Sequence, residues 1–114
     1  MENINDNTIV TTVSGALRRT LKEEMEKDER IYLLGEDIGD PYGGIYKVTK
    51  GLMSQFGKER VINSPLSEIA IAGAGVGAAI AGMKPVIEIM YADFLPITMD
   101  QLVNCAAKMY FLSH

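Results

Sequence analysis

The sequence predicts an α/β fold, in which a parallel β-sheet carries helices on both faces. Three short apolar runs have the length and the flanking charged residues or glycines of buried strands, at residues 31–34, 60–63 and 86–90. They alternate with four segments of helical spacing, at about residues 11–27, 47–56 and 65–82 and after residue 96. Helices and strands in alternation imply parallel strands joined by right-handed crossovers.

The amino-terminal third contains the first helix and the first strand. Residues 1–8 are polar and acidic, and we expect a flexible leader there, ahead of a domain over residues 9–114. Thr11 or Thr12 can cap the first helix, whose apolar residues recur at helical spacing to about residue 27. After the first strand, glycines and a proline predict a loop over residues 36–44.

The rest of the chain repeats the alternation. A helix over about residues 47–56 should stop at Gly57 and precede the second strand. Pro65 then opens the third helix, because proline fits a first helical turn, and this helix should end near Gly82. After the third strand, a turn over residues 93–96 leads into a fourth helix that runs to the end of the chain.

Composition and charge exclude several classes of protein. The 114 residues are 47% hydrophobic and 23% charged, with a net charge of −4 and no basic cluster, so nucleic acid is not an expected partner. The apolar run over residues 69–82 is too short and too rich in glycine and alanine to span a membrane. Cys105 is the single cysteine, which fits a reducing compartment, and no targeting signal is visible. We therefore expect a cytoplasmic protein.

The carboxyl ends of the predicted strands are the expected ligand site, because ligands of parallel α/β sheets bind there. Polar residues follow these ends, and Glu68 is the most informative of them. It precedes a run of small apolar residues that should be buried, and a buried carboxylate needs a partner. A favourable interaction with the helix dipole, worth about 0.3–1 kcal/mol, is the simplest explanation.

The glycines that follow Glu68 allow two interpretations. Residues 73–78 match the dinucleotide fingerprint G-x-G-x-x-A, which would define a nucleotide-binding α/β module with a strand over residues 67–72. The same run also fits a tightly packed helix in which glycines let neighbouring backbones approach. A helix across residues 67–82 would exclude the nucleotide site.

A series of short motifs then runs in unbroken order from about residue 9 to residue 113, including Leu-Leu-Gly-Glu-Asp at 33–37 and Pro-Leu-Ser-Glu at 65–68. The others are at residues 48–52, 56–57, 60–61, 82–86 with Glu88, 93–94, 100–101 and 106–108. This series resembles the β subunit of the thiamine-diphosphate-dependent E1 component of 2-oxoacid dehydrogenase complexes. That group includes the pyruvate, branched-chain 2-oxoacid and acetoin dehydrogenases.

The resemblance implies that this chain is the N-terminal part of a pyrimidine-binding domain, apparently incomplete. The E1 α subunit of this family holds the diphosphate and Mg²⁺ through a Gly-Asp-Gly motif, which is absent here. The whole enzyme decarboxylates a 2-oxo acid, or cleaves acetoin, and passes the acyl group to the lipoyl domain of the E2 acyltransferase. This chain alone is therefore expected to be inactive.

The resemblance also assigns roles to five residues. Glu68 is the catalytic acid–base partner of the cofactor's aminopyrimidine ring, and Phe94 packs on that ring. Leu66 and Met90 line the same pocket. Glu36 belongs to a polar passage between two active sites, although a strand-end carboxylate that faces water fits it equally well. No residue is assigned to a metal.

An assembly-only fragment is a further interpretation. Sheet strands missing from this chain would leave an open parallel edge, which proteins normally protect. We therefore expect self-association.

Overall fold

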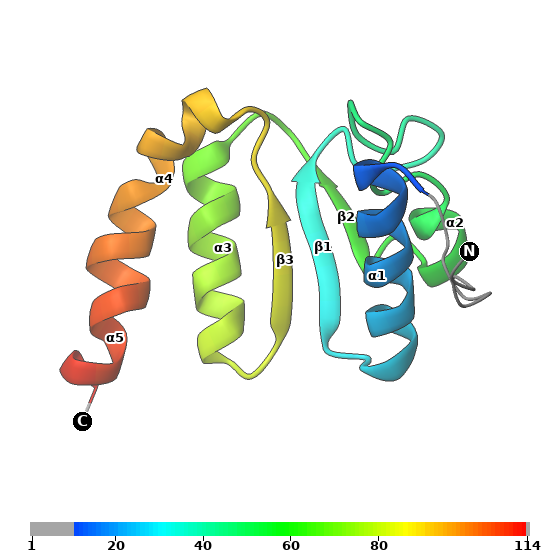
Figure 1. Ribbon diagram of the computed structural model, residues 1–114. Helices are drawn as coiled ribbons and strands as arrows, with labels where there is room; N and C mark the ends of the chain where they lie inside the picture. Colours follow the sequence, from blue (N-terminus) through cyan, green and yellow to red (C-terminus); the bar gives the residue numbers. More distant parts are fainter. Residues whose placement is uncertain (1–10, 114) are drawn as a thin grey trace, which may run out of the picture.

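Three parallel strands form the sheet of the computed structural model, which describes residues 11–113 (Figure 1). They are β1 (Ile31–Glu36), β2 (Val61–Ser64) and β3 (Lys84–Glu88), arranged in the order β2-β1-β3. The predicted α/β class with a parallel sheet is confirmed. The predicted leader lies outside the described residues.

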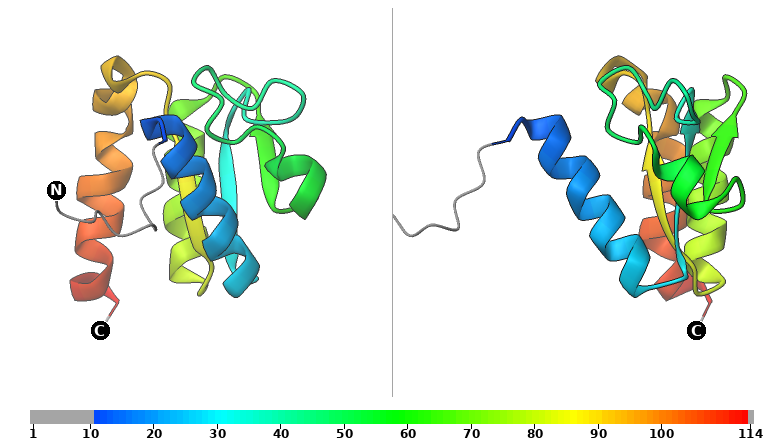
Figure 2. Two further views of the ribbon diagram at one scale, coloured as in Figure 1. Left: turned by 45° about the vertical axis from the view of Figure 1, so that its right-hand side comes forward. Right: turned by 90° about the vertical axis from the view of Figure 1, so that its right-hand side faces the viewer.

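Helices cover both faces of this sheet, as predicted. Helix α1 (Val13–Lys27) lies on one face and α3 (Glu68–Ile80) on the other (Figure 2). The short helix α2 (Leu52–Phe56) contributes to the same hydrophobic cluster as α1. Each face therefore has its own core.

The central strand β1 supplies both cores, because successive side chains of a strand point to opposite faces. Leu33 packs with Met25 of α1 and Val61 of β2 in one cluster. Tyr32 and Leu34 pack with Ile71 of α3 in the other. All of these side chains are buried, as expected for a strand covered on both faces.

The carboxyl-terminal residues form one helical rod that packs on α3. It begins with a 3₁₀ turn, η1 (Ala92–Phe94), and continues through α4 (Leu95–Asp100), a π-helical segment η2 (Gln101–Ala106) and α5 (Ala107–Leu112). The rod lies at the edge of the molecule, on the far side of α3 from α1 (Figures 1 and 2).

Several predicted boundaries were wrong, for local reasons. The helix expected over residues 47–56 begins only at Leu52, because Lys47 and Gly51 adopt φ values of 60° and 85°, which a right-handed helix excludes. Strand β3 begins and ends two residues earlier than predicted, and β1 continues to Glu36. The expected turn over residues 93–96 is shorter, since α4 already begins at Leu95.

The helix α3 also decides between the two interpretations of the glycines. Gly73, Gly75 and Gly77 all lie inside it, so the strand required by a dinucleotide fingerprint is absent and the nucleotide-site hypothesis was wrong. A Cβ atom at Gly75 would lie 2.9 Å from Cγ2 of Ile87 in β3. The glycine thus permits close approach of α3 to the sheet, and tight packing is the interpretation that holds.

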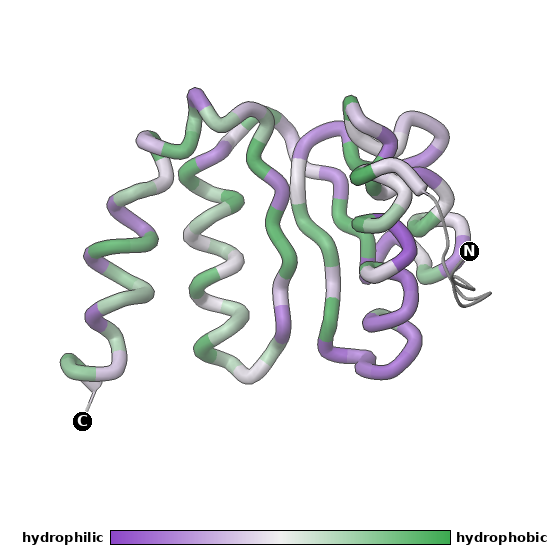
Figure 3. The backbone as a smooth tube through the Cα atoms, viewed as in Figure 1, coloured by the Kyte–Doolittle hydropathy of each residue, from purple (hydrophilic) through white to green (hydrophobic). Residues whose placement is uncertain are grey.

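Apolar surface remains uncovered around this sheet. The first turns of α1 diverge from it (Figure 2), and Val13 and Leu17 are 80% and 50% exposed. Hydrophobic residues dominate β3, α3 and the carboxyl-terminal rod, whereas α1 is largely hydrophilic (Figure 3). Strand β3 pairs with β1 on one side and has no strand on its other side within residues 11–113.

Candidate functional site

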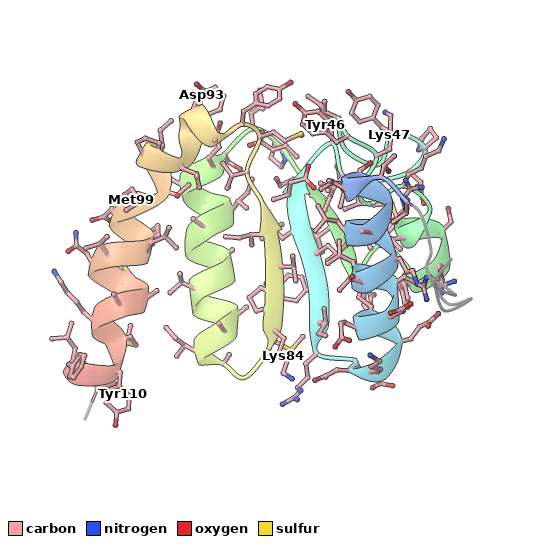
Figure 4. All side chains as sticks on the ribbon, viewed as in Figure 1. Tyr46, Lys47, Lys84, Asp93, Met99 and Tyr110 are labelled. Atoms are coloured by element: carbon pink, nitrogen blue, oxygen red, sulfur yellow. The ribbon has the colours of Figure 1, made fainter. Side chains whose placement is uncertain are left out.

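The candidate site lies where the three strands end, at the upper edge of the sheet in Figure 1. Parallel register brings Glu36 of β1 opposite Ser64 of β2, and Gly35 opposite Glu88 of β3. Polar side chains from three chain segments therefore gather at one edge. Figure 4 shows Tyr46 and Asp93 at this edge and Lys84 at the opposite one.

Glu36 is buried, with 5% of its surface exposed, so the alternative in which it faces water was wrong. Its Oε1 accepts a hydrogen bond of 2.9 Å from the backbone N–H of Ser67. Ser67 is the N-cap of α3, but its own hydroxyl donates to the carbonyl of Pro65 and does not cap the helix. Glu36 thus satisfies an orphan donor at the start of α3, as the glutamate of a capping box does from within a helix.

This contact positions Glu68, which is the first residue of α3 and follows Ser67 directly. Glu68 is partly buried, and its carboxylate makes no hydrogen bond or ion pair with the rest of the described chain. The positive end of the α3 dipole favours a negative charge there. Glu36 therefore anchors the backbone just before Glu68, while the Glu68 carboxylate itself has no partner within residues 11–113.

Glu88, the last residue of β3, is a third carboxylate at this edge. The resemblance to E1 β subunits assigned it no role. Burial raises the pKa of its carboxyl group above the ordinary value. A Cβ atom at Gly44 would lie 3.2 Å from Glu88 Oε1, so the carboxylate packs against the loop after β1. No described residue forms a hydrogen bond with it. Its position at the end of an apolar strand was the signal that could have identified it.

Replacing Glu88 with Gln should increase the free energy of unfolding at pH 7. Because the pKa of this carboxyl is raised in the folded chain, its ionisation destabilises the fold as the pH rises through that pKa. The difference between Glu88→Gln and the unchanged chain should therefore shrink as the pH falls through the raised pKa toward 4.5, the ordinary pKa of the group, and should be lost below it. Urea unfolding at several pH values measures this difference. The exposed Glu29→Gln is the control, and an equal gain in that variant would contradict the prediction.

Met90 lies just beyond β3 and lines a groove of about 580 Å³ between α1 and the end of this strand. The other lining residues are mostly apolar, among them Leu17, Leu21 and Val86. Asp93 is one of the polar residues that line the groove. The groove provides a surface on which a flat apolar ring could pack.

Leu66 and Phe94 are less enclosed than their predicted roles require. Leu66, in the turn between β2 and α3, is 84% exposed, and Phe94, at the end of η1, is 38% exposed. All five predicted residues thus lie near one edge of the sheet, but this chain does not close a pocket around Leu66. Their individual roles stay predictions. Within residues 11–113, no group of three His, Cys, Asp or Glu side chains could hold a metal ion.

The fold is that of a parallel α/β domain, a class in which ligands bind beyond the carboxyl ends of the strands. Residues 10–113 match the family described as transketolase, pyrimidine binding domain. The chain belongs to this family. No described helix has the length and apolar character needed to cross a membrane.

Three proteins similar to this chain are beta subunits of 2-oxoisovalerate or pyruvate dehydrogenases. The chain is 48% identical over 99 residues to the 2-oxoisovalerate dehydrogenase subunit beta of Bacillus subtilis, covering 87% of this chain and 30% of that protein. It is 46% identical over 102 residues to the pyruvate dehydrogenase E1 component subunit beta of Rickettsia bellii, covering 90% and 31%. The mitochondrial human protein of the same description is 44% identical over 102 residues, covering 90% and 28%. The chain thus spans less than a third of the length of these relatives.

Proposed function

We propose that this chain is the pyrimidine-binding part of the β subunit of a thiamine-diphosphate-dependent 2-oxoacid dehydrogenase E1 enzyme. The substrate would be a pyruvate-like or branched-chain 2-oxo acid, or acetoin, and the acyl product would pass to a lipoyl group. The main support is Glu68, a partly buried carboxylate with no partner in the described chain, at the start of a helix and at the ligand-binding edge. The similarity to the β subunits of two such dehydrogenases adds support.

The residues at this edge fit an aminopyrimidine ring. Bound thiamine diphosphate would supply the nucleophilic carbon that attacks the carbonyl of the substrate. Glu68 would hold and exchange a proton with a ring nitrogen, a task for which a carboxylate in a dry site is well suited. Met90 and Phe94 would contact the faces of the ring, and Glu36 would keep the turn before Glu68 in place through its contact with Ser67.

The same proposal requires a partner subunit. By the similarity to E1 β subunits, the diphosphate and Mg²⁺ would be held by an E1 α subunit. The 84% exposure of Leu66 agrees with a pocket that a second protein surface completes. The E2 acyltransferase would be the second partner, and a cytoplasmic location stays a prediction.

The assembly-only role is the second candidate, and exposed apolar side chains along the free side of β3 favour it. Val86 is 41% exposed and Ile80, at the end of α3, is 56% exposed. Light scattering of the purified chain at low concentration tests this role: self-association is expected, and a monomer would exclude it.

The enzymatic proposal is tested by turnover of pyruvate, 2-oxoisovalerate and acetoin with an artificial electron acceptor. The chain alone should give no turnover, because the Gly-Asp-Gly motif that holds the diphosphate in this family does not occur in its sequence. Activity of the chain free of other subunits would overturn that expectation. Mixed with an E1 α subunit, it should copurify with that subunit. Failure to associate with any E1 α subunit of the bacterial pyruvate or 2-oxoisovalerate dehydrogenases would overturn the partner assignment.

A further inference from the structure

We propose that a cleft between α1 and α2 binds a phosphate group. The cleft has a volume of about 440 Å³ and shares no residue with the edge that carries Glu68. The proposal is therefore independent of the proposed function. The lining residues are Gly15, Arg18, Arg19, Lys22, Lys50, Gly51, Leu52 and Gln55.

Positive charge is concentrated in this cleft. Arg18, Arg19 and Lys22 lie along one side of α1, and Lys50 approaches from the loop before α2, while no Asp or Glu is among the lining residues. The chain as a whole has a net charge of −4, so a cleft lined by four cations and no acidic residue differs in charge from the chain as a whole. Cations that face one another across a cleft repel, and a bound anion removes that repulsion.

Two of the four cations already have partners and two do not. Arg19 Nε lies 2.6 Å from Glu23 Oε1, and Lys22 Nζ lies 3.9 Å from Glu26 Oε1. Arg18 and Lys50 form no ion pair within the described part of the chain. Arg18 belongs to α1 and Lys50 to the loop before α2, so these two cations line the cleft from different segments of the chain.

The Nε atom of Arg18 gives a second, independent indication. It is shielded from solvent and has no hydrogen-bond acceptor among the described residues. A buried donor without an acceptor is destabilising, so native structures rarely contain one. An oxygen atom of a ligand would satisfy it once the Arg18 side chain, which lines the cleft, turns this atom toward the ligand.

Hydrogen bonds link the two walls of the cleft and anchor the loop at its edge. Gln55 Nε2 of α2 donates to Glu26 Oε1 of α1 at 2.9 Å. Asp40 accepts hydrogen bonds from the backbone N–H groups of Gly51, at 2.6 Å, and Ser54, at 2.7 Å, which anchors the loop that carries Lys50. Such contacts reduce the ordering that a ligand must impose on binding.

A phosphate group fits this arrangement better than a carboxylate does. The guanidinium of Arg18 can donate two parallel hydrogen bonds to two oxygens, while the ammonium of Lys50 acts as a point charge toward a third. A carboxylate has two oxygens and cannot present a third to the opposite wall. The ligand is therefore expected to be inorganic phosphate or a phosphate ester.

Calorimetric titration of the chain with inorganic phosphate, at constant ionic strength, tests the proposal. Saturable binding at one site is expected, and sodium glycerol phosphate in a parallel titration distinguishes a free ion from an ester. Arg18→Gln and Lys50→Gln should each weaken binding by about tenfold, since each removes one charge-assisted contact.

Lys108→Gln is the matched control, because it removes the same charge from α5, at the opposite side of the molecule from α2 (Figure 1). If Lys108→Gln weakened phosphate binding equally, the effect would come from the net charge of the chain and the proposal would be overturned. A lack of saturable binding would also overturn it. Circular dichroism checks that the Arg18 variant folds. If it does not, Lys50→Gln, at an exposed loop position, decides alone.

Discussion

Replacing Glu68 with Gln should lower the activity of the E1 heteromer that contains this chain by about 10²- to 10⁴-fold, the usual contribution of a general acid–base group. Gln has nearly the same shape but cannot exchange the proton that the proposed role requires. The fold should persist, because the Glu68 carboxylate forms no hydrogen bond or ion pair in the described chain. The loss of its interaction with the α3 dipole should cost only about 0.3–1 kcal/mol.

Turnover with saturating thiamine diphosphate measures the effect, and circular dichroism checks the fold. Glu59→Gln is the matched control, since Glu59 is an exposed carboxylate in the turn before β2 and has no assigned role. Activity of the Glu68 variant within threefold or so of the control would remove Glu68 from the acid–base role, because a lost general acid–base group costs far more.

Arg60→Ala should lower the free energy of unfolding by about 3 kcal/mol, because it removes the guanidinium that donates to three backbone carbonyl groups. Of these, the carbonyl of Asp28 keeps only a longer hydrogen bond of 3.2 Å from the N–H of Ile31. The guanidinium donates to the carbonyls of Met25 at 3.0 Å, Asp28 at 2.9 Å and Ile31 at 2.6 Å. Its central carbon also lies 5.3 Å from the ring centre of Phe56. One side chain therefore ties the end of α1, the start of β1 and α2 together.

Urea unfolding at a single protein concentration measures this loss. Arg60→Lys should recover only part of it, since an ammonium group cannot reach all three carbonyls in the geometry of a guanidinium fork. Lys58→Ala, two residues away and exposed, should change stability by less than about 0.5 kcal/mol. Similar losses in the two alanine variants would show that Arg60 does not hold these elements together.

The order of the elements was predictable because it depends on patterns within single segments. The apolar run of β1 and the helical spacing of α1 each reflect which side chains must leave water. A helix start near Glu68 was also predictable from Pro65 and Glu68, although Pro65 lies three residues before α3 and not in its first turn as expected. The loop over residues 36–44 was predicted, but its continuation to Gly51 was not. Its path depends on contacts such as that between the Thr49 hydroxyl and the carbonyl of Ile38, eleven residues earlier.

The sequence by itself determined the α/β class, the strands, the family resemblance and the carboxylate at the start of α3. Only the tertiary structure decided that Glu36 is buried against Ser67, that Glu88 is a third carboxylate at the same edge, and that the glycines of α3 pack against Ile87. The physical reason is the range of the interactions. Hydrophobic periodicity and helix capping depend on residues a few positions apart in the sequence. The hydrogen-bond partner of a buried carboxylate, and the side chain that packs against a glycine, come from another strand or helix. Such partners are set only when the sheet assembles.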